Sequence, residues 1–323
     1  MAKRKRRTVL EFDENTSQPV RPGGDNWELC VKAFNDGMTL RNLSYYTKKH
    51  YMGNLNTIYR LLKELKFPTA PTKLTIDNFR QLVIDMLENQ QLNPVTVNHR
   101  IKALQLFFKF LLEEGYITNN PVENLKKVKA SRTIIEAFTE DQIRELLAQP
   151  NKKTFVGFRD YCIMLLLLDT GLRLKELLNI RVEDVDLAQR KIKVMGKGSK
   201  ERYVYFNTTT KEALSRFITI RGDSLHHSFL WITREDEPLN RNTLQERIRL
   251  YGREAGIKNV RVSPHTFRHT FAKLFILNGG NTLALQQLLG HSTLDMVRVY
   301  VNLWGTDLQA MHRKFSPVDK LIK

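Results

Sequence analysis

The amino-acid sequence predicts a mainly helical protein of two domains, the second of which also contains a small β-sheet. The 323 residues are long for one domain and comfortable for two. Between about residues 26 and 118, apolar residues recur at helical spacing without a long alternating run. An alternating run appears later, at about residues 190–206. The hydrophobic content of 41% allows a sizeable core, so we expect a globular chain.

The net charge indicates a polyanionic partner. Lys and Arg total 52 against 34 Asp and Glu, which gives a formal charge of +18. Such an excess of positive charge causes repulsion between side chains of the folded protein, and nucleic acid is the first candidate to neutralise it. A membrane surface is the second, but the most apolar run, residues 162–168, is too short to span a bilayer, and the basic start MAKRKRR leads into an acidic stretch. We expect a cytoplasmic, nucleoid-associated protein with no membrane partner.

Residues 1–25 have the composition of a disordered basic tail. The tail either contacts phosphates or only aids solubility, and the sequence leaves both alternatives open. Residues 26–118 are expected to form a small helical domain. One helix is indicated by Leu55, Ile58 and Leu62, a second begins after Thr75 as its N-cap, and a third begins near Thr96.

Residues 119–136 are predicted to be a basic linker, and residues 137–323 to form the second, mixed domain. Thr139 and Gln142 have the spacing of a capping box and should start a helix. A strongly apolar helix follows through residues 163–168. The alternation over residues 190–206, interrupted by the glycine-rich turn 196–200, predicts a β-hairpin.

The first chemical motif in the second domain is DTGLRLKEL, at residues 169–177. Gly171 can end the apolar helix in a left-handed conformation, which exposes Arg173 at the start of the next helix. Glu176 lies three residues further on, hence on the same helix face. By itself the pair is typical of a surface ion pair.

The second motif is the turn GKGSK at residues 196–200. It is not a Walker loop, because Lys191 stands where the first glycine of that motif is required. A lysine on a flexible hairpin, here Lys197, can reach over a bound backbone and donate a proton to a leaving oxygen. By itself the turn is typical of an exposed, solubilising loop.

The third motif is SPHTFRH at residues 263–269. Ser263 is a good N-cap and Pro264 a good first helical residue. His265 and Arg268 then share one face near the helix start, where free N–H groups and the helix dipole favour anions. These local features predict a phosphate site.

The fourth motif is LGHSTLD, followed by Tyr300. Gly290 should end one helix, and Ser292 and Asp295 should begin the next as a capping box. His291 falls in the corner between them. By itself Tyr300 is more typical of a buried core aromatic.

Taken together, the four motifs supply what a phosphodiester needs. Two guanidiniums can neutralise the non-bridging oxygens, and histidines can donate a hydrogen bond or accept the phenol proton. The tyrosine can then attack phosphorus. Because phosphoryl transfer depends mostly on positioning and charge stabilisation, fixed donors can replace a metal. With just two cysteines, Cys30 and Cys162, the chain also has no Cys-based zinc site, so we expect neither a metal nor a cofactor.

With these motifs the chain resembles the tyrosine recombinase (phage integrase) family. The matching stretches are DTGLRLKELLNI, VMGKGSKERYVYF, SPHTFRHTFA and LLGHSTLDMVRVY, and NHRIKALQLFFKFLLEEGYITNNP resembles the family's helical core-binding domain. The resemblance implies that Arg173 and Arg268 clamp the phosphate, with Glu176 in support. It implies that Lys197 protonates the 5′-oxygen that leaves.

The same resemblance implies roles near the nucleophile. His265 would assist proton transfer, His291 would hydrogen-bond the phosphate, and Tyr300 would form a 3′-phosphotyrosine bond. The family acts without ATP, as a homotetramer on two double-stranded recombination sites, through a Holliday junction. Six further basic side chains are candidates for DNA contact: Lys48, Lys49, Arg100, Lys102, Arg241 and Lys200.

Two alternatives share part of this pattern. A DNA-binding regulator could use a recombinase scaffold, but the complete set of catalytic residues disfavours it. A type IB topoisomerase-like nicking enzyme shares the chemistry, but the helical domain and the chain size fit a recombinase better. Among recombinases, the YVNL stretch after His291 departs from the YTH of Xer proteins and favours a mobile-element integrase or transposase over an Xer enzyme.

Overall fold

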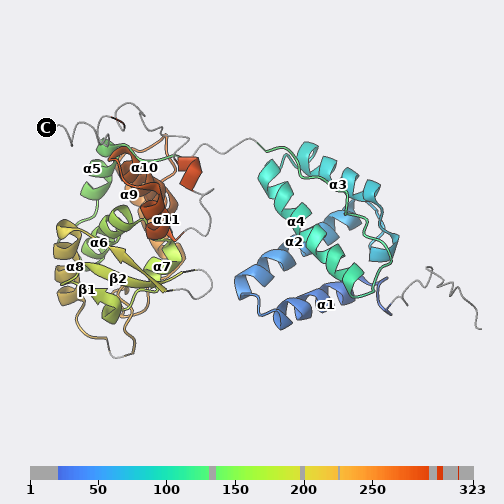
Figure 1. The fold of residues 1–323 in the computed structure, drawn as a ribbon, viewed down its shortest axis with the longest axis horizontal. Coiled ribbons are helices and arrows are strands. Elements are labelled where there is room, and N and C mark those ends of the chain that lie inside the picture. The colour runs from blue at the N-terminus through green and yellow to red at the C-terminus, as the bar shows by residue number, and fades with distance from the viewer. Residues whose placement is uncertain are drawn as a thin grey trace, which may run out of the picture. The chain divides into compact units, whose positions relative to one another are not determined.

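The computed structural model describes residues 21–130, 136–196, 201–224, 226–290, 297–300 and 312. The chain divides into two compact units, Met1–Thr133 and Ile134–Lys323. Helices predominate in both, and a three-stranded antiparallel sheet lies in the second (Figure 1). The predicted fold class, mainly helical with a small sheet, is confirmed.

The amino-terminal unit is a helical bundle around an aromatic core. Its elements are α1 (Trp27–Leu40), α2 (Tyr45–Glu64), the 3-10 helix η1 (Pro71–Lys73), α3 (Ile76–Glu88) and α4 (Pro94–Glu113). Trp27 packs between Tyr59 of α2 and the rings of Phe107 and Phe108 on α4. Phe79 of α3 packs edge to face against Phe108, so the Phe108 ring of α4 contacts aromatic side chains from both α1 and α3.

Local sequence signals explain where these helices begin. Thr75 caps α3 as predicted, in a capping box with Asn78. The helix predicted to begin near Thr96 begins two residues earlier, because Asn93 accepts a hydrogen bond from the backbone of Val95 and Pro94 occupies the first helical position.

The stretch after α4 packs against this bundle. Val122 and Leu125, which lie within the predicted linker, are buried in the aromatic core. The Asn98 side chain exchanges hydrogen bonds of 2.8 and 2.9 Å with the backbone of Val128. At the other end of the unit, the Arg21 backbone donates to the Gly115 carbonyl.

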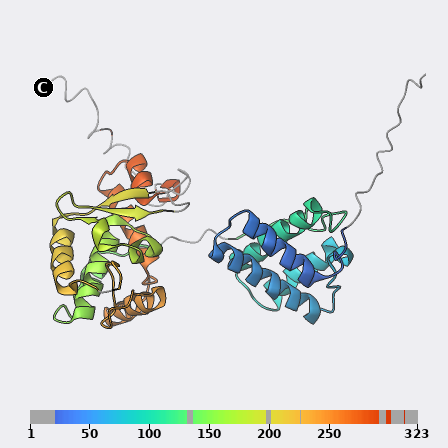
Figure 2. The same cartoon turned by 90° about the horizontal axis from the view of Figure 1, so that it is seen from below.

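The carboxy-terminal unit places helices beside the sheet (Figures 1 and 2). Its helices are α5 (Glu140–Ala148), α6 (Phe155–Thr170), α7 (Leu174–Leu178), α8 (Thr208–Arg221), α9 (Arg241–Glu254), α10 (Pro264–Leu277) and α11 (Thr282–Leu289), with the 3-10 helix η2 (Val182–Asp184). Its strands are β1 (Val185–Asp186), β2 (Lys191–Met195) and β3 (Glu201–Tyr205), in the order β1-β2-β3. The hairpin of β2 and β3 was predicted, whereas the short β1 was not.

The apolar helix α6 is the central element of this unit and packs against α8 and α10. It ends, as predicted, at Gly171, which adopts a left-handed conformation with φ of +61°. A side chain could not replace this glycine, since an added Cβ would lie 2.6 Å from the Phe271 ring on α10. The turn at Gly171 therefore lies directly against α10, and the candidate site lies beside it.

Candidate active site

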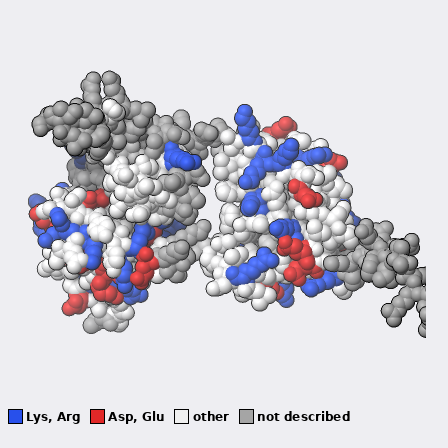
Figure 3. Space-filling view, in the orientation of Figure 1, with Lys and Arg blue, Asp and Glu red and all other residues white. Residues whose placement is uncertain are grey.

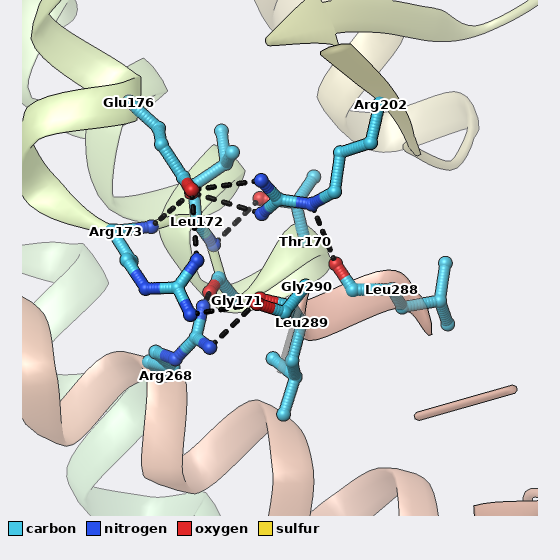
Figure 4. A network of polar contacts seen from close by, with 10 residues as sticks. All are labelled: Thr170, Gly171, Leu172, Arg173, Glu176, Arg202, Arg268, Leu288, Leu289 and Gly290. Carbon is cyan, nitrogen blue, oxygen red and sulfur yellow. Dashed lines mark hydrogen bonds and ion pairs between the residues drawn. The ribbon is translucent and has the colours of Figure 1, made fainter. Parts of the chain in front are cut away.

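Arginines from three elements converge around one glutamate and the end of α11 (Figure 4). Arg173 caps the start of α7, Arg202 lies on β3 and Arg268 lies on α10. Glu176 of α7 and the backbone at Gly290 lie between them. The site therefore brings together segments that are far apart in the sequence.

Arg173 is fixed to Glu176 from both its backbone and its side chain. The Arg173 backbone N–H donates to Glu176 Oε2 at 2.9 Å, and its Nη1 donates to Oε1, also at 2.9 Å. The first bond caps an otherwise unpaired donor at the start of α7. The spacing of three residues between Arg173 and Glu176 predicted that both lie on one helix face. In the structure this spacing lets the Glu176 carboxylate hold the Arg173 guanidinium in a fixed orientation.

Arg202 forms a second, two-pronged ion pair with the same carboxylate. Its Nη1 lies 2.7 Å from Glu176 Oε1 and its Nη2 lies 2.9 Å from Oε2. Burial raises the pKa of the Glu176 carboxyl, but the hydrogen bonds from Arg202 and Arg173 outweigh burial and hold that pKa below its ordinary value. Glu176 is therefore ionised at neutral pH.

Arg268 is the most enclosed of the three arginines, with 3% of its surface exposed. Ser263 and Pro264 begin its helix as predicted. Its Nη1 donates to the Gly171 carbonyl at 2.7 Å and its Nη2 to the Leu289 carbonyl at 2.8 Å. Burial and the neighbouring Arg173 lower the pKa of Arg268 to about 10, so the guanidinium keeps its charge at neutral pH.

All three guanidiniums hold backbone carbonyls at the end of α11. Arg202 Nε donates to Leu288 at 3.3 Å, Arg268 to Leu289, and Arg173 Nη2 to Gly290 at 2.9 Å. The last carbonyls of a helix are unpaired and carry its negative end, so cations there are favourable. This arrangement fixes the chain immediately before His291.

Tyr300 lies beside a pair of histidines on α10. Its hydroxyl is 2.8 Å from Nδ1 of His269, and the His269 ring lies 4.2 Å from the His265 ring, at 71° to it. Burial raises the pKa of the Tyr300 phenol, whereas the charges of Arg268 and Arg173 act to lower it. Partial burial, Arg268 and Arg173 lower the pKa of His265, which favours a neutral ring at pH 7.

The structure thus brings together part of the predicted set. Five predicted residues lie in this region: Arg173, Glu176, His265, Arg268 and Tyr300. Three others lie outside the described residues: Lys197, Lys200 and His291. Their roles, like those of the whole set, remain predictions.

Four of the predicted DNA contacts lie on helices of the amino-terminal unit. Lys48 and Lys49 are on α2, and Arg100 and Lys102 are on α4. Arg241 begins α9 in the other unit. Figure 3 shows basic and acidic side chains interspersed on the drawn face of each unit, so charge on that face does not by itself locate a DNA surface.

Sequence reasoning missed two residues of the site, Arg202 and His269. A signal for Arg202 existed: it pairs across the hairpin with the buried Val194, so a charged side chain occupies a register position on the inner face of the sheet. His269 follows His265 by four residues, which places both on one helix face. Neither signal shows that Arg202 pairs with Glu176 or that His269 contacts Tyr300.

The ion pair of Arg202 should contribute measurably to stability. Arg202→Met is expected to lower the free energy of unfolding of the carboxy-terminal unit by about 3 kcal/mol, because it leaves a buried carboxylate with half its donors. Arg144→Met is the matched control, since the Arg144 pairs with Glu140 and Asp141 are exposed and worth less than about 1 kcal/mol each. Urea denaturation of both variants measures the difference, and equal losses would contradict the role given to Arg202.

No group of three or more His, Cys, Asp or Glu side chains is arranged to hold a metal ion in the ranges that the structure describes. Within the same ranges, every helix is too short or too polar to cross a membrane.

Comparison with known proteins identifies the family. The sequence pattern of the phage integrase family matches residues 136–304. The chain is 32% identical to the tyrosine recombinase XerD of Shewanella oneidensis, over 71% of this chain and 77% of that protein. It is 30% identical to the tyrosine recombinase XerC of Vibrio cholerae, over 86% and 89% respectively. Its fold matches the Tn1549 transposon integrase, solved in complex with transposon right end DNA, with a TM-score of 0.72 at 19% identity, over 89% of this chain and 99% of the other. The chain therefore belongs to the phage integrase family of tyrosine recombinases.

Proposed function

We propose that this tyrosine recombinase carries out site-specific exchange of DNA strands with Tyr300 as its nucleophile. One contact supports this above all: the Tyr300 hydroxyl lies 2.8 Å from an imidazole nitrogen, within the electrostatic influence of Arg268 and Arg173. A phenol next to a proton acceptor and two guanidiniums is suited to attack a phosphodiester.

The two guanidiniums can bind the non-bridging oxygens of the target phosphate. Each terminal nitrogen of Arg173 and Arg268 already donates one hydrogen bond, to Glu176, Gly171 or the end of α11. Each such nitrogen carries two hydrogens, so a second donor remains on each for a phosphate oxygen. The existing bonds fix both guanidiniums before DNA arrives, which reduces reorganisation in the transition state.

In the proposed reaction, Tyr300 Oη attacks phosphorus, the bond to the 5′-oxygen breaks, and a 3′-phosphotyrosine forms. A 5′-hydroxyl from the partner duplex then attacks the same phosphorus and releases Tyr300. Each step exchanges one phosphodiester bond for another, so no external energy source is needed. We expect this to occur in a homotetramer on two double-stranded DNA sites, through a Holliday junction, with the basic residues of α2 and α4 among the DNA contacts.

The biological setting is also a proposal. The sequence favours a mobile-element integrase or transposase, and the fold match to a transposon integrase is consistent with this. The alternative is an Xer-type recombinase, because the relatives include XerD and XerC. In either setting we expect the protein to act on DNA in the cytoplasm.

The direct test is to find a cleaved site. The purified protein is incubated with labelled DNA from both flanks of its own gene, and covalent protein–DNA junctions are mapped by sequencing and mass spectrometry. We expect a defined 3′-phosphate joined to Tyr300 and a free 5′-hydroxyl. A junction on another residue, or a 5′-linked adduct, would contradict the proposal.

Metal removal should leave cleavage intact. Excess EDTA is expected to leave the rate of adduct formation unchanged within about twofold, because guanidinium and imidazole groups supply the charge stabilisation that a metal would provide. Adduct formation is measured with and without added magnesium. Loss of cleavage in EDTA that magnesium restores would argue against this mechanism, whereas loss of subunit assembly alone would not.

A further inference from the structure

The two histidines of α10 are not equivalent with respect to Tyr300. His265, at the second position of the helix, is more exposed than His269, one turn later. It is His269 whose Nδ1 lies 2.8 Å from the Tyr300 hydroxyl. The centroid of the His265 ring lies 4.2 Å from that of the His269 ring.

The environment of Tyr300 makes a nearby proton acceptor necessary. The residue is 3% exposed and packs with Val297, Leu285 and Leu289. Its burial raises the pKa of the phenol, so the hydroxyl remains protonated at neutral pH. A protonated phenol is a weak nucleophile and is activated when an adjacent base takes its proton during attack.

The residue type and the geometry of His269 satisfy this need. A neutral imidazole with its hydrogen on Nε2 presents Nδ1 as an acceptor, and 2.8 Å is within hydrogen-bond reach. The ring is carried by α10, the same helix that carries Arg268, so one rigid element positions both the base and a phosphate-binding group. The exposed position of His265 suits contact with an incoming phosphate better than contact with the buried hydroxyl.

We propose that His269 is a catalytic residue that accepts the Tyr300 proton during strand cleavage and returns it during rejoining. This inference rests on the proposed function. As the bond between Oη and phosphorus forms, the phenol proton moves to Nδ1, and the 5′-oxygen leaves with a proton from the general acid of that reaction. When the 5′-hydroxyl of the partner duplex attacks, it gives its proton to the now deprotonated general acid, the bond between phosphorus and Oη breaks, and the imidazolium of His269 reprotonates Oη.

Two substitutions of His269 distinguish a role as a base from a role as a hydrogen-bond acceptor only. His269→Ala removes both properties. In His269→Asn the side-chain oxygen can occupy the position of Nδ1 and accept a hydrogen bond, but it cannot take up a proton at neutral pH. Both variants are expected to form the covalent adduct about 10²- to 10⁴-fold more slowly than wild type. Their affinity for the mapped DNA site should stay within about twofold of wild type, and thermal unfolding of each checks its fold.

A change in the nucleophile provides a readout that a structural role would not affect. A fluorinated tyrosine at position 300 has a more acidic phenol and needs a base less. It should therefore recover much of the rate lost in His269→Asn and make that rate rise with pH towards the new phenol pKa. His265→Asn is the matched comparison on the same helix, and its rate loss should be the same with either tyrosine.

The outcomes distinguish the alternatives. Wild-type rates in His269→Asn would mean that His269 only orients Tyr300, and faster cleavage in His269→Ala would mean that it restrains Tyr300 instead. A loss in His269→Asn that fluorination leaves unchanged would also overturn the base assignment. The proposed function fails separately, if the wild-type chain forms no adduct or attaches DNA to a residue other than Tyr300.

Discussion

Tyr300→Phe is expected to eliminate the covalent protein–DNA adduct while leaving DNA affinity within about twofold of wild type. The substitution removes the oxygen that attacks phosphorus, and no other group can replace it at that position. The phenyl ring keeps its place in the cluster of Val297, Leu285 and Leu289, so the fold around it should persist. Adduct formation is measured on denaturing gels, and affinity by gel shift or fluorescence anisotropy on the mapped site.

Two other tyrosines of the same unit provide the control. Tyr203 and Tyr205 lie on β3 and are 49% and 57% exposed, whereas Tyr300 is 3% exposed. Tyr203→Phe and Tyr205→Phe should form the adduct at nearly the wild-type rate. If Tyr300→Phe still becomes linked to DNA, the nucleophile has been assigned wrongly, and these two residues are the next to examine.

The sequence predicted the elements that depend on local chemistry. Thr75, Thr139 and Ser263 each cap the helix that follows, and Gly171 and Gly290 each end a helix with positive φ. A cap is satisfied within three residues, so its signal lies in one short stretch. The same reason explains why β1 was missed: two residues are too few to show a period, and their pairing with β2 determines their conformation.

The contacts that build the site could not be predicted in the same way. Glu176 and Arg202 are 26 positions apart, and Arg268 and Gly171 are 97 apart. Each pair is created by the packing of α6, α10 and the hairpin, which no local pattern encodes. The sequence indicated which residue types the chemistry needs, but the structure was required to show that Glu176 binds two arginines and that Tyr300 contacts His269.

The arginine cluster also links the hairpin to the helix end that precedes Tyr300. Arg202 is anchored to Glu176 through the two hydrogen bonds of one ion pair, and to the Leu288 carbonyl through Nε. Gly290 lies against it, since a Cβ there would be 3.1 Å from the Arg202 guanidinium. Displacement of β3 would therefore disturb the carboxylate that orients Arg173. The hairpin of β2 and β3 is thus tied to the arginine that we propose binds the target phosphate.

Lys197→Ala is expected to cleave ordinary DNA about 10²- to 10⁴-fold more slowly, because we propose that Lys197 is the general acid. The structure does not describe Lys197 itself, but the strands on either side of it are paired up to Met195 and Glu201. Arg173 and Arg268 can already offset the charge of the non-bridging oxygens. The remaining need is a proton for the 5′-oxygen, since an alkoxide is a poor leaving group.

A sulfur substitution in the DNA separates this role from charge stabilisation. A substrate whose bridging 5′-oxygen is replaced by sulfur has a leaving group that needs no acid. Lys197→Ala should therefore recover on this substrate, whereas Arg173→Ala should not, because its guanidinium acts on the non-bridging oxygens in both substrates. Lys200→Ala, on the same turn, is the control and should show no selective recovery. If Lys197→Ala and Arg173→Ala respond alike, Lys197 stabilises charge or binds DNA, and the proton comes from another group.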